Sequence, residues 1–190
     1  TSYFCTNVPG EKPAGISRKV VEAMQTDTGV VFALGSYNQT GSPVRRVSEE
    51  GISLVDFDTK SGEMRRLSTY RALLNPSYLA WDEESRRLYV VSEDLESAGE
   101  VHAFGLSEDF ELGKLFSAPG PGVSACHIAI DKNRDLVFSA AYIDGRVQAR
   151  RLTSDGFEKA IVELQLIGNG PTTDRQASPH AHQVVIDEQS

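Results

Sequence analysis

Histidine and arginine side chains gather towards the C-terminal end of the sequence. Three of the four histidines, His127, His180 and His182, lie in the last third of the chain, and Arg175 closely precedes the last two. Imidazole exchanges protons near neutral pH, so it can serve as a general base. The planar guanidinium of Arg175 suits an anionic group, because it can donate two parallel hydrogen bonds. These residue types predict a polar site that activates water and holds an anion.

Two other interpretations of the histidines stay open at this point. In an extended chain alternate residues point to one side, so His180 and His182 would form a pair able to bind zinc, with His127 as a third ligand. A histidine at the start of a strand can also serve only as a hydrogen-bond partner of the backbone. His102 alternates with apolar neighbours, and we expect it to be structural.

Internal repeats set the framework that must position these side chains. Three elements recur: a glycine before alternating apolar residues (Gly51, Gly99, Gly145) at intervals of 48 and 46 residues, an apolar run (88–92, 136–140) at 48, and a short strand-like segment (79–82, 128–131, 184–187) at 49 and 56. Between copies of the run stand turn residues such as aspartate, serine and glycine. Such a period is typical of β-propeller blades.

The clearest copy predicts four short strands, at 77–81, 87–92, 100–106 and 112–117, from its alternating and β-branched residues. One four-stranded blade has two apolar faces, which only stacked neighbours can cover. We therefore expect an all-β fold of the propeller type, with antiparallel blades over residues 30–190. The repeats account for about three and a half blades. Residues 1–29 do not fit the repeat and are expected to form an N-terminal extension with one short helix over 17–25.

Composition excludes several partners. The net charge is −8, with 19 basic and 27 acidic residues, and phosphate-binding surfaces need a basic face, so we expect neither nucleic acid nor an anionic membrane as partner. The longest obvious apolar run, residues 30–34, is far shorter than the roughly 20 residues that span a bilayer. Two cysteines make no secreted disulfide framework, and the N-terminus lacks a signal-peptide core, which favours the cytoplasm.

Several segments resemble one known family, the seven-bladed propeller lactonases. They are Gly35-Ser36-Tyr37, 51–58 with Ser61-Gly62, 75–79, 88–93, Cys126-His127, the region of Tyr142, and the stretch from Gly170 through Asp174-Arg175-Gln176 to Pro179-His180-Ala181-His182. This family includes propeller-type 6-phosphogluconolactonases and fungal carboxy-muconate lactonising enzymes. The sequence departs from the family pattern at Ala141, where asparagine is usual, and the second half of the family's propeller is absent.

The resemblance implies hydrolysis of a small sugar lactone in the pentose phosphate pathway, with no metal and no cofactor. Lactone hydrolysis needs a base for the attacking water and donors for the developing oxyanion. We expect His127, His182 and Arg175 to be catalytic, with a histidine as base and Arg175 as anion clamp. The expected substrate-binding residues are His180, Tyr142 and Glu93.

Alternative functions remain on the same scaffold. One is a lactonising isomerase that acts on carboxy-cis,cis-muconate, and another is a non-catalytic propeller that binds other proteins. An open stack of blades leaves apolar faces and strand edges in water. We therefore expect either self-association or a further half of the ring to complete the assembly.

Overall fold

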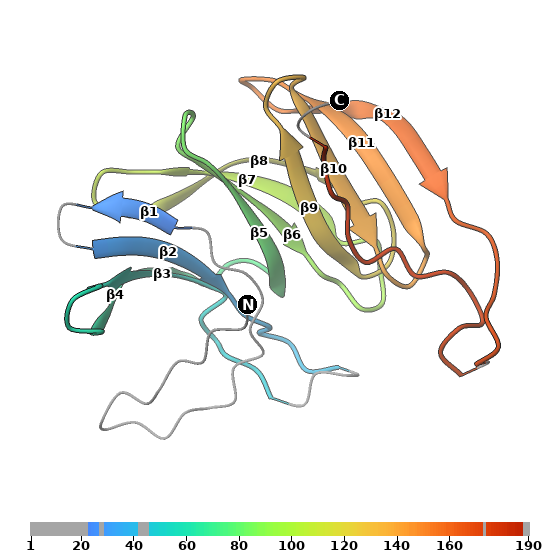
Figure 1. Ribbon diagram of the computed structural model, residues 1–190, viewed down its shortest axis with the longest axis horizontal. Helices are drawn as coiled ribbons and strands as arrows, with labels where there is room; N and C mark the ends of the chain where they lie inside the picture. The colour runs from blue at the N-terminus through green and yellow to red at the C-terminus, as the bar shows by residue number, and fades with distance from the viewer. Residues whose placement is uncertain (1–22, 27–28, 42–45, 173, 188–190) are drawn as a thin grey trace.

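The computed structural model describes residues 23–26, 29–41, 46–172 and 174–187. Within this part of the chain the regular elements are strands, which form three four-stranded sheets (Figure 1). The first sheet holds β1 (Ala23–Thr26), β2 (Gly29–Gly35), β3 (Ile52–Phe57) and β4 (Met64–Tyr70); the second holds β5 (Pro76–Asp82), β6 (Arg87–Ser92), β7 (Glu100–Leu106) and β8 (Leu112–Pro119); the third holds β9 (Ala125–Asp131), β10 (Leu136–Ala141), β11 (Arg146–Leu152) and β12 (Phe157–Gln165).

Each sheet is an antiparallel meander in which sequence neighbours pair. Alternating apolar residues and tight turns dictate this arrangement, because consecutive side chains of a strand point to opposite faces. The expected all-β class with four-stranded antiparallel blades is confirmed. The four strands predicted in the second copy agree with β5 to β8 to within two residues at either end.

Three sequence predictions need correction. The helix expected over 17–25 is wrong for its last three residues, which belong to β1 and pair with β2, whereas 17–22 lie outside the described residues. The strand expected at 184–187 is not formed, because no neighbouring strand among the described residues pairs with it. The interval of 48 residues between the apolar runs is also wrong by one residue. Arg87 pairs with Asp82 in the second sheet and Leu136 pairs with Asp131 in the third, so equivalent positions of these strands are 49 residues apart.

Two apolar layers hold the sheets together. Between the first and second sheets lie Leu54, Leu79 and Phe104, all at most 1% exposed. Between the second and third lie Tyr89, Val101 and Ile128 with similar burial. Burial of each such side chain contributes about 1.5–3 kcal/mol relative to exposure, so the layers fix how the sheets stack.

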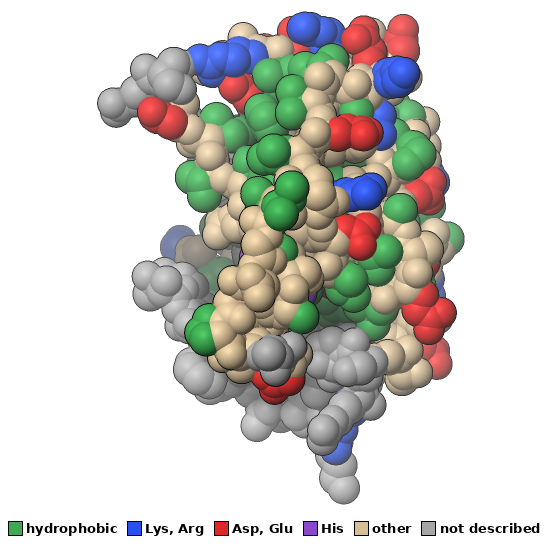
Figure 2. All heavy atoms as spheres, turned by 90° about the vertical axis from the view of Figure 1, so that its right-hand side faces the viewer, with side chains coloured by type: hydrophobic (Ala, Val, Ile, Leu, Met, Phe, Trp, Pro, Cys, Tyr) green, Lys and Arg blue, Asp and Glu red, His purple; other side chains and the backbone are tan. Residues whose placement is uncertain are grey.

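The outer face of the third sheet has no neighbouring sheet among the described residues. Strand pairing places Phe138, Ala149 and Val162 side by side on the face opposite to Ile128 and Val137. Val162 is 52% exposed and Leu164, two residues on, is 51% exposed. Figure 2 shows this side of the molecule, where hydrophobic side chains lie open to solvent among charged ones. We call the surface formed by Phe138, Val162 and Leu164 the open face.

Candidate active site

Polar side chains from all three sheets meet at one end of the strands. Ser36, Glu93 and Tyr142 are the first residues after β2, β6 and β10, the second strand of each sheet. Their backbone N–H groups donate to the carbonyls of Gly51, Asn75 and Ser124, respectively. Because the strands are antiparallel, the residues just before β5 and β9 lie at this same end. We call this end the mouth.

Glu93 stands at the centre of the mouth and joins three sheets. It is 6% exposed, and its two carboxylate oxygens accept hydrogen bonds of 2.5 Å from the Tyr37 hydroxyl and the Ser124 hydroxyl. Burial, the hydrogen bond to Glu93 and the negative charge of Glu93 raise the pKa of Tyr37. Tyr37 is therefore a hydrogen-bond donor and not a base, and the Glu93 carboxylate is already occupied on both oxygens.

Asn75 ties the loop after β2 to the second sheet. Its side-chain oxygen accepts from the backbone N–H groups of Asn38 and Gln39, at 3.0 and 2.9 Å, and its amide nitrogen donates to the Glu93 carbonyl at 3.0 Å. The backbone of Asn75 has φ 37°, in the left-handed region that asparagine tolerates better than most residues. This bridge fixes Tyr37, one residue before Asn38, against Glu93.

An aromatic group lies beside this network. The His180 ring stacks on Tyr142 with centroids 4.4 Å apart and planes at 8°, and the His182 ring meets Tyr142 edge-on at 5.5 Å. The Cys126 thiol contacts the backbone carbonyl oxygens of Ala181 and His182, at 3.7 and 3.6 Å. The segment that carries both histidines is thus held along the start of β9, with the imidazole of His182 facing solvent.

His127 is the buried histidine of the mouth, at 4% exposure. Its ring packs against Tyr78 with centroids 4.1 Å apart, and its Nδ1 accepts the N–H of Val184 at 3.4 Å. Since this contact uses the Nδ1 lone pair, a neutral His127 carries its proton on Nε2. His182 is consequently the better candidate for a base.

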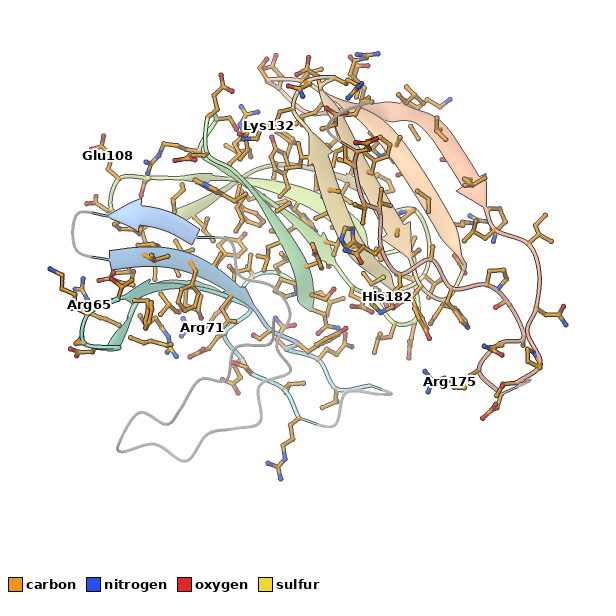
Figure 3. All side chains as sticks on the ribbon, viewed as in Figure 1. Arg65, Arg71, Glu108, Lys132, Arg175 and His182 are labelled. Atoms are coloured by element: carbon orange, nitrogen blue, oxygen red, sulfur yellow. The ribbon has the colours of Figure 1, made fainter. Side chains whose placement is uncertain are left out.

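Arg175 lies on an exposed loop that runs from the end of β12 to the histidine segment. Figure 3 shows Arg175 on the same side of the molecule as His182, and clear of the sheets. Its backbone N–H donates to Thr172 at 3.2 Å, and its carbonyl oxygen faces the His180 ring. The position suits a guanidinium that reaches a ligand at the rim of the mouth.

The structure thus brings Glu93, Tyr142, His180, His182 and His127 to one end of the sheets and leaves Arg175 at its edge. Sequence reasoning assigned no role to the residues that hold them, which are Tyr37, Asn75 and Ser124. One signal was available: Tyr37 and Asn75 lie in segments that resemble the lactonase family. Their partnership is invisible in sequence because it joins positions far apart in the chain.

Two negative findings concern only the described residues. Among them, no three histidine, cysteine, aspartate or glutamate side chains converge as ligands for a metal ion. Nor does any helix in that part of the chain have the length and apolar character to cross a membrane.

Comparisons with known proteins agree with this architecture. The family described as "Lactonase, 7-bladed beta-propeller" matches residues 31–190. The 6-phosphogluconolactonase of Bacillus subtilis is 29% identical over 157 residues, which are 82% of this chain and 42% of that protein. A solved structure of a putative 6-phosphogluconolactonase from Bacteroides uniformis is 30% identical, with a TM-score of 0.69 over 82% of this chain and 43% of that one.

A more distant structure has the same fold. The periplasmic gluconolactonase PpgL of Pseudomonas aeruginosa aligns with a TM-score of 0.72 at 20% identity, over 84% of this chain and 44% of that one. The chain therefore spans a little under half the length of these relatives.

Proposed function

The chain belongs to the seven-bladed β-propeller lactonase family, and we propose that the ring containing it hydrolyses a sugar lactone at the mouth. The observation that carries the proposal is the convergence of Glu93, Tyr142, His180 and His182 with the buried His127 at one end of three sheets. Relatives at about 30% identity bear the name 6-phosphogluconolactonase, so the proposed substrate is 6-phosphogluconolactone, which this reaction converts to 6-phosphogluconate.

His182 is proposed as the general base that takes a proton from the attacking water. Its imidazole is exposed, whereas Nδ1 of His127 already accepts a backbone N–H. His127, buried against Tyr78, is proposed to support the site from behind the reacting atoms. Arg175 would bind the substrate phosphate through its two-pronged donor edge. Glu93 keeps its place at the mouth through Tyr37 and Ser124.

The test is lactone turnover by the ring-complete protein, with spontaneous hydrolysis subtracted. His182→Ala should lower kcat by about a hundredfold, which is the usual size of a general-base contribution. Arg175→Ala should raise KM for the phosphorylated lactone and leave KM for glucono-lactone nearly unchanged. Arg65→Ala is the matched control, since Arg65 lies on β4 and is 72% exposed. Unchanged turnover in both mouth variants would sink the proposal.

The two alternative functions make different predictions for the same protein. Consumption of carboxy-cis,cis-muconate without lactone hydrolysis would favour the lactonising isomerase. Inactivity of the assembled ring on a panel of lactones would favour a protein-binding module. Hydrolysis is preferred because the named relatives at about 30% identity are 6-phosphogluconolactonases.

We propose that further propeller blades cover the open face, supplied either by a second copy of the chain or by additional chain. Both apolar layers inside the structure form where one sheet packs against the next. The apolar face of a blade therefore requires a neighbouring sheet. We also propose a cytoplasmic location, because a phosphorylated sugar carries charge that does not cross the apolar bilayer. Cell fractionation tests this location, and recovery from the periplasm, the compartment named for the Pseudomonas protein, would contradict it.

A further inference from the structure

His180 differs from the other histidines of the mouth in how its nitrogens are used. Nδ1 lies 2.8 Å from the carbonyl oxygen of Tyr142, and Nε2 lies 3.1 Å from the carbonyl oxygen of Arg175. One face of its ring is stacked on Tyr142 at 4.4 Å. Both polar atoms are therefore committed to the backbone, and His180 has no nitrogen left to offer a substrate.

Both neighbours of the ring are acceptors. A neutral imidazole has a single N–H and can donate to only one of the two carbonyls, whereas an imidazolium donates to both. As a clamp, the imidazolium joins two backbone segments, the turn after β10 and the loop that carries Arg175, through two hydrogen bonds, and the neutral form with its proton on Nε2 joins them through the bond to Arg175 and the stacking on Tyr142. These segments are 33 residues apart in sequence and share no strand pairing in the described sheets.

The rest of the Arg175 loop is closed on itself. Gly170 donates to the carbonyl of Gln176 at 2.8 Å, and Gln176 donates to the carbonyl of Thr172 at 2.7 Å. The side-chain oxygen of Gln176 accepts from the N–H of Thr172 at 3.1 Å. These bonds keep the loop compact but do not join it to a sheet. Among the described residues, the contact at Arg175 that leads from this compact loop towards a sheet is the one made by His180.

We propose that His180 is a positioning residue that holds the Arg175 loop against Tyr142, and so keeps the Arg175 guanidinium at the mouth. This assignment replaces the direct substrate contact that the sequence suggested for His180. It rests on the proposed lactone hydrolysis only for its kinetic consequence. The clamp itself is a property of the loop and can be measured without any substrate.

Trypsin provides that measurement, because it cleaves after arginine and the carbonyl of the Arg175–Gln176 bond is the group that His180 holds. The chain is digested briefly under native conditions, and cleavage after Arg175 is compared with cleavage after Arg71, an exposed residue between β4 and β5. In His180→Ala, cleavage after Arg175 should rise about tenfold while cleavage after Arg71 stays constant. Unchanged cleavage after Arg175 would overturn the proposal.

Two further variants separate hydrogen bonding from stacking. His180→Phe keeps an aromatic ring on Tyr142 but removes both nitrogens, so its loop should be cleaved as fast as in His180→Ala. His180→Gln retains N–H donors and should be cleaved within about threefold of the wild-type rate. Protection in His180→Phe equal to wild type would assign the effect to stacking and reject the clamp. A parallel rise at both bonds in His180→Phe would reject a role specific to the loop.

Kinetics of the ring-complete protein then show whether the clamp acts through Arg175. His180→Phe should raise KM for 6-phosphogluconolactone about five- to tenfold and change kcat less than twofold. In an Arg175→Ala background, the same substitution should have no further effect. A further loss in that background would mean that His180 contacts the substrate itself. If wild-type protein does not hydrolyse the lactone, the proposed function fails, and the trypsin result still decides the clamp.

Discussion

The Tyr37 hydroxyl lies 2.5 Å from Oε2 of Glu93, although 56 residues separate the two positions. The other carboxylate oxygen accepts from Ser124 at the same distance. Tyr37 follows a strand of the first sheet, Glu93 a strand of the second, and Ser124 precedes one of the third. A single carboxylate thus connects all three sheets at the mouth, where the apolar layers between them end.

Removal of this carboxylate should destabilise the chain. In Glu93→Ala the buried hydroxyl of Ser124 and the half-buried hydroxyl of Tyr37 lose their acceptor, which costs about 2–4 kcal/mol in the free energy of unfolding. Urea denaturation followed by tryptophan fluorescence measures this, since Trp81 lies in β5. Glu96→Ala, at an exposed position three residues on, should change the free energy by less than about 0.5 kcal/mol. Equal effects of the two variants would contradict the connecting role.

Stability should fall as the pH drops from 7 to 5, owing to His102. Burial, with a smaller contribution from the positive charge of Lys114, lowers the pKa of His102 from 6.5 to about 4, although Glu100 opposes the shift. At a pH between these two pKa values the unfolded chain binds a proton that the folded chain does not, so acidification favours the unfolded state.

The expected loss from His102 between pH 7 and 5 is about 1–2 kcal/mol. His102→Leu removes the titrating group at similar volume, and its melting temperature should fall less over this range than that of the wild type. Hydrogen bonds lower the pKa of aspartates such as Asp94, so their contribution to the stability of the fold is lost only at a pH below the ordinary pKa of aspartate. They therefore do not obscure the comparison. Parallel melting profiles for the two proteins would refute the role of His102.

A methyl group at Gly145 should disturb the histidine segment. Gly145 has φ 61°, which strains any other residue, and a Cβ there would collide with the backbone carbonyl of Pro179. Gly145→Ala should therefore cost about 2–3 kcal/mol and displace His180 from Tyr142. Gly156→Ala is the matched control, because a Cβ at Gly156 meets nothing within 4 Å. Thermal unfolding of both variants checks the difference.

The open face should make the isolated chain associate. Val162 and Leu164 are each about half exposed on a face that has no neighbouring sheet among the described residues. Light scattering on a sizing column should give a mass above the 20.7 kDa of one chain. Val162→Lys combined with Leu164→Lys should shift the mass towards one chain, whereas Lys159→Glu on the same strand should not. A wild-type chain that elutes as a monomer would count against association through this face.

The parts of the fold that follow from local patterns could be predicted from sequence. Alternation and turn residues located β5 to β8 almost to the residue, because both signals arise within each strand. The repeat interval was misjudged by one residue because similar apolar runs align equally well in either register. Only the pairing of Asp82 with Arg87 and of Asp131 with Leu136 decides it.

The candidate site could be predicted in part. Family resemblance pointed to Glu93, Tyr142 and the histidines, but not to the contacts that distinguish their roles. The Glu93 carboxylate accepts from two hydroxyls, and the two ring nitrogens of His180 each face a backbone carbonyl. Most of these contacts join segments that are distant in sequence, so the sequence does not reveal them. Strand β1 was also missed, because its partner β2 and not its own sequence determines it.

The residue that follows the second strand of each sheet has a wider consequence. At Ser36, Glu93 and Tyr142 the backbone N–H is satisfied by a carbonyl, a hydrogen bond that any side chain except that of proline would leave in place. Three equivalent positions here bear a hydroxyl, a carboxylate and a phenol. A substitution at Tyr142 could therefore alter what the rim recognises while the strand end keeps its backbone hydrogen bond, whereas the Glu93 side chain also connects the sheets. Such a ring offers evolution, or a protein engineer, an adjustable position for new substrate specificity.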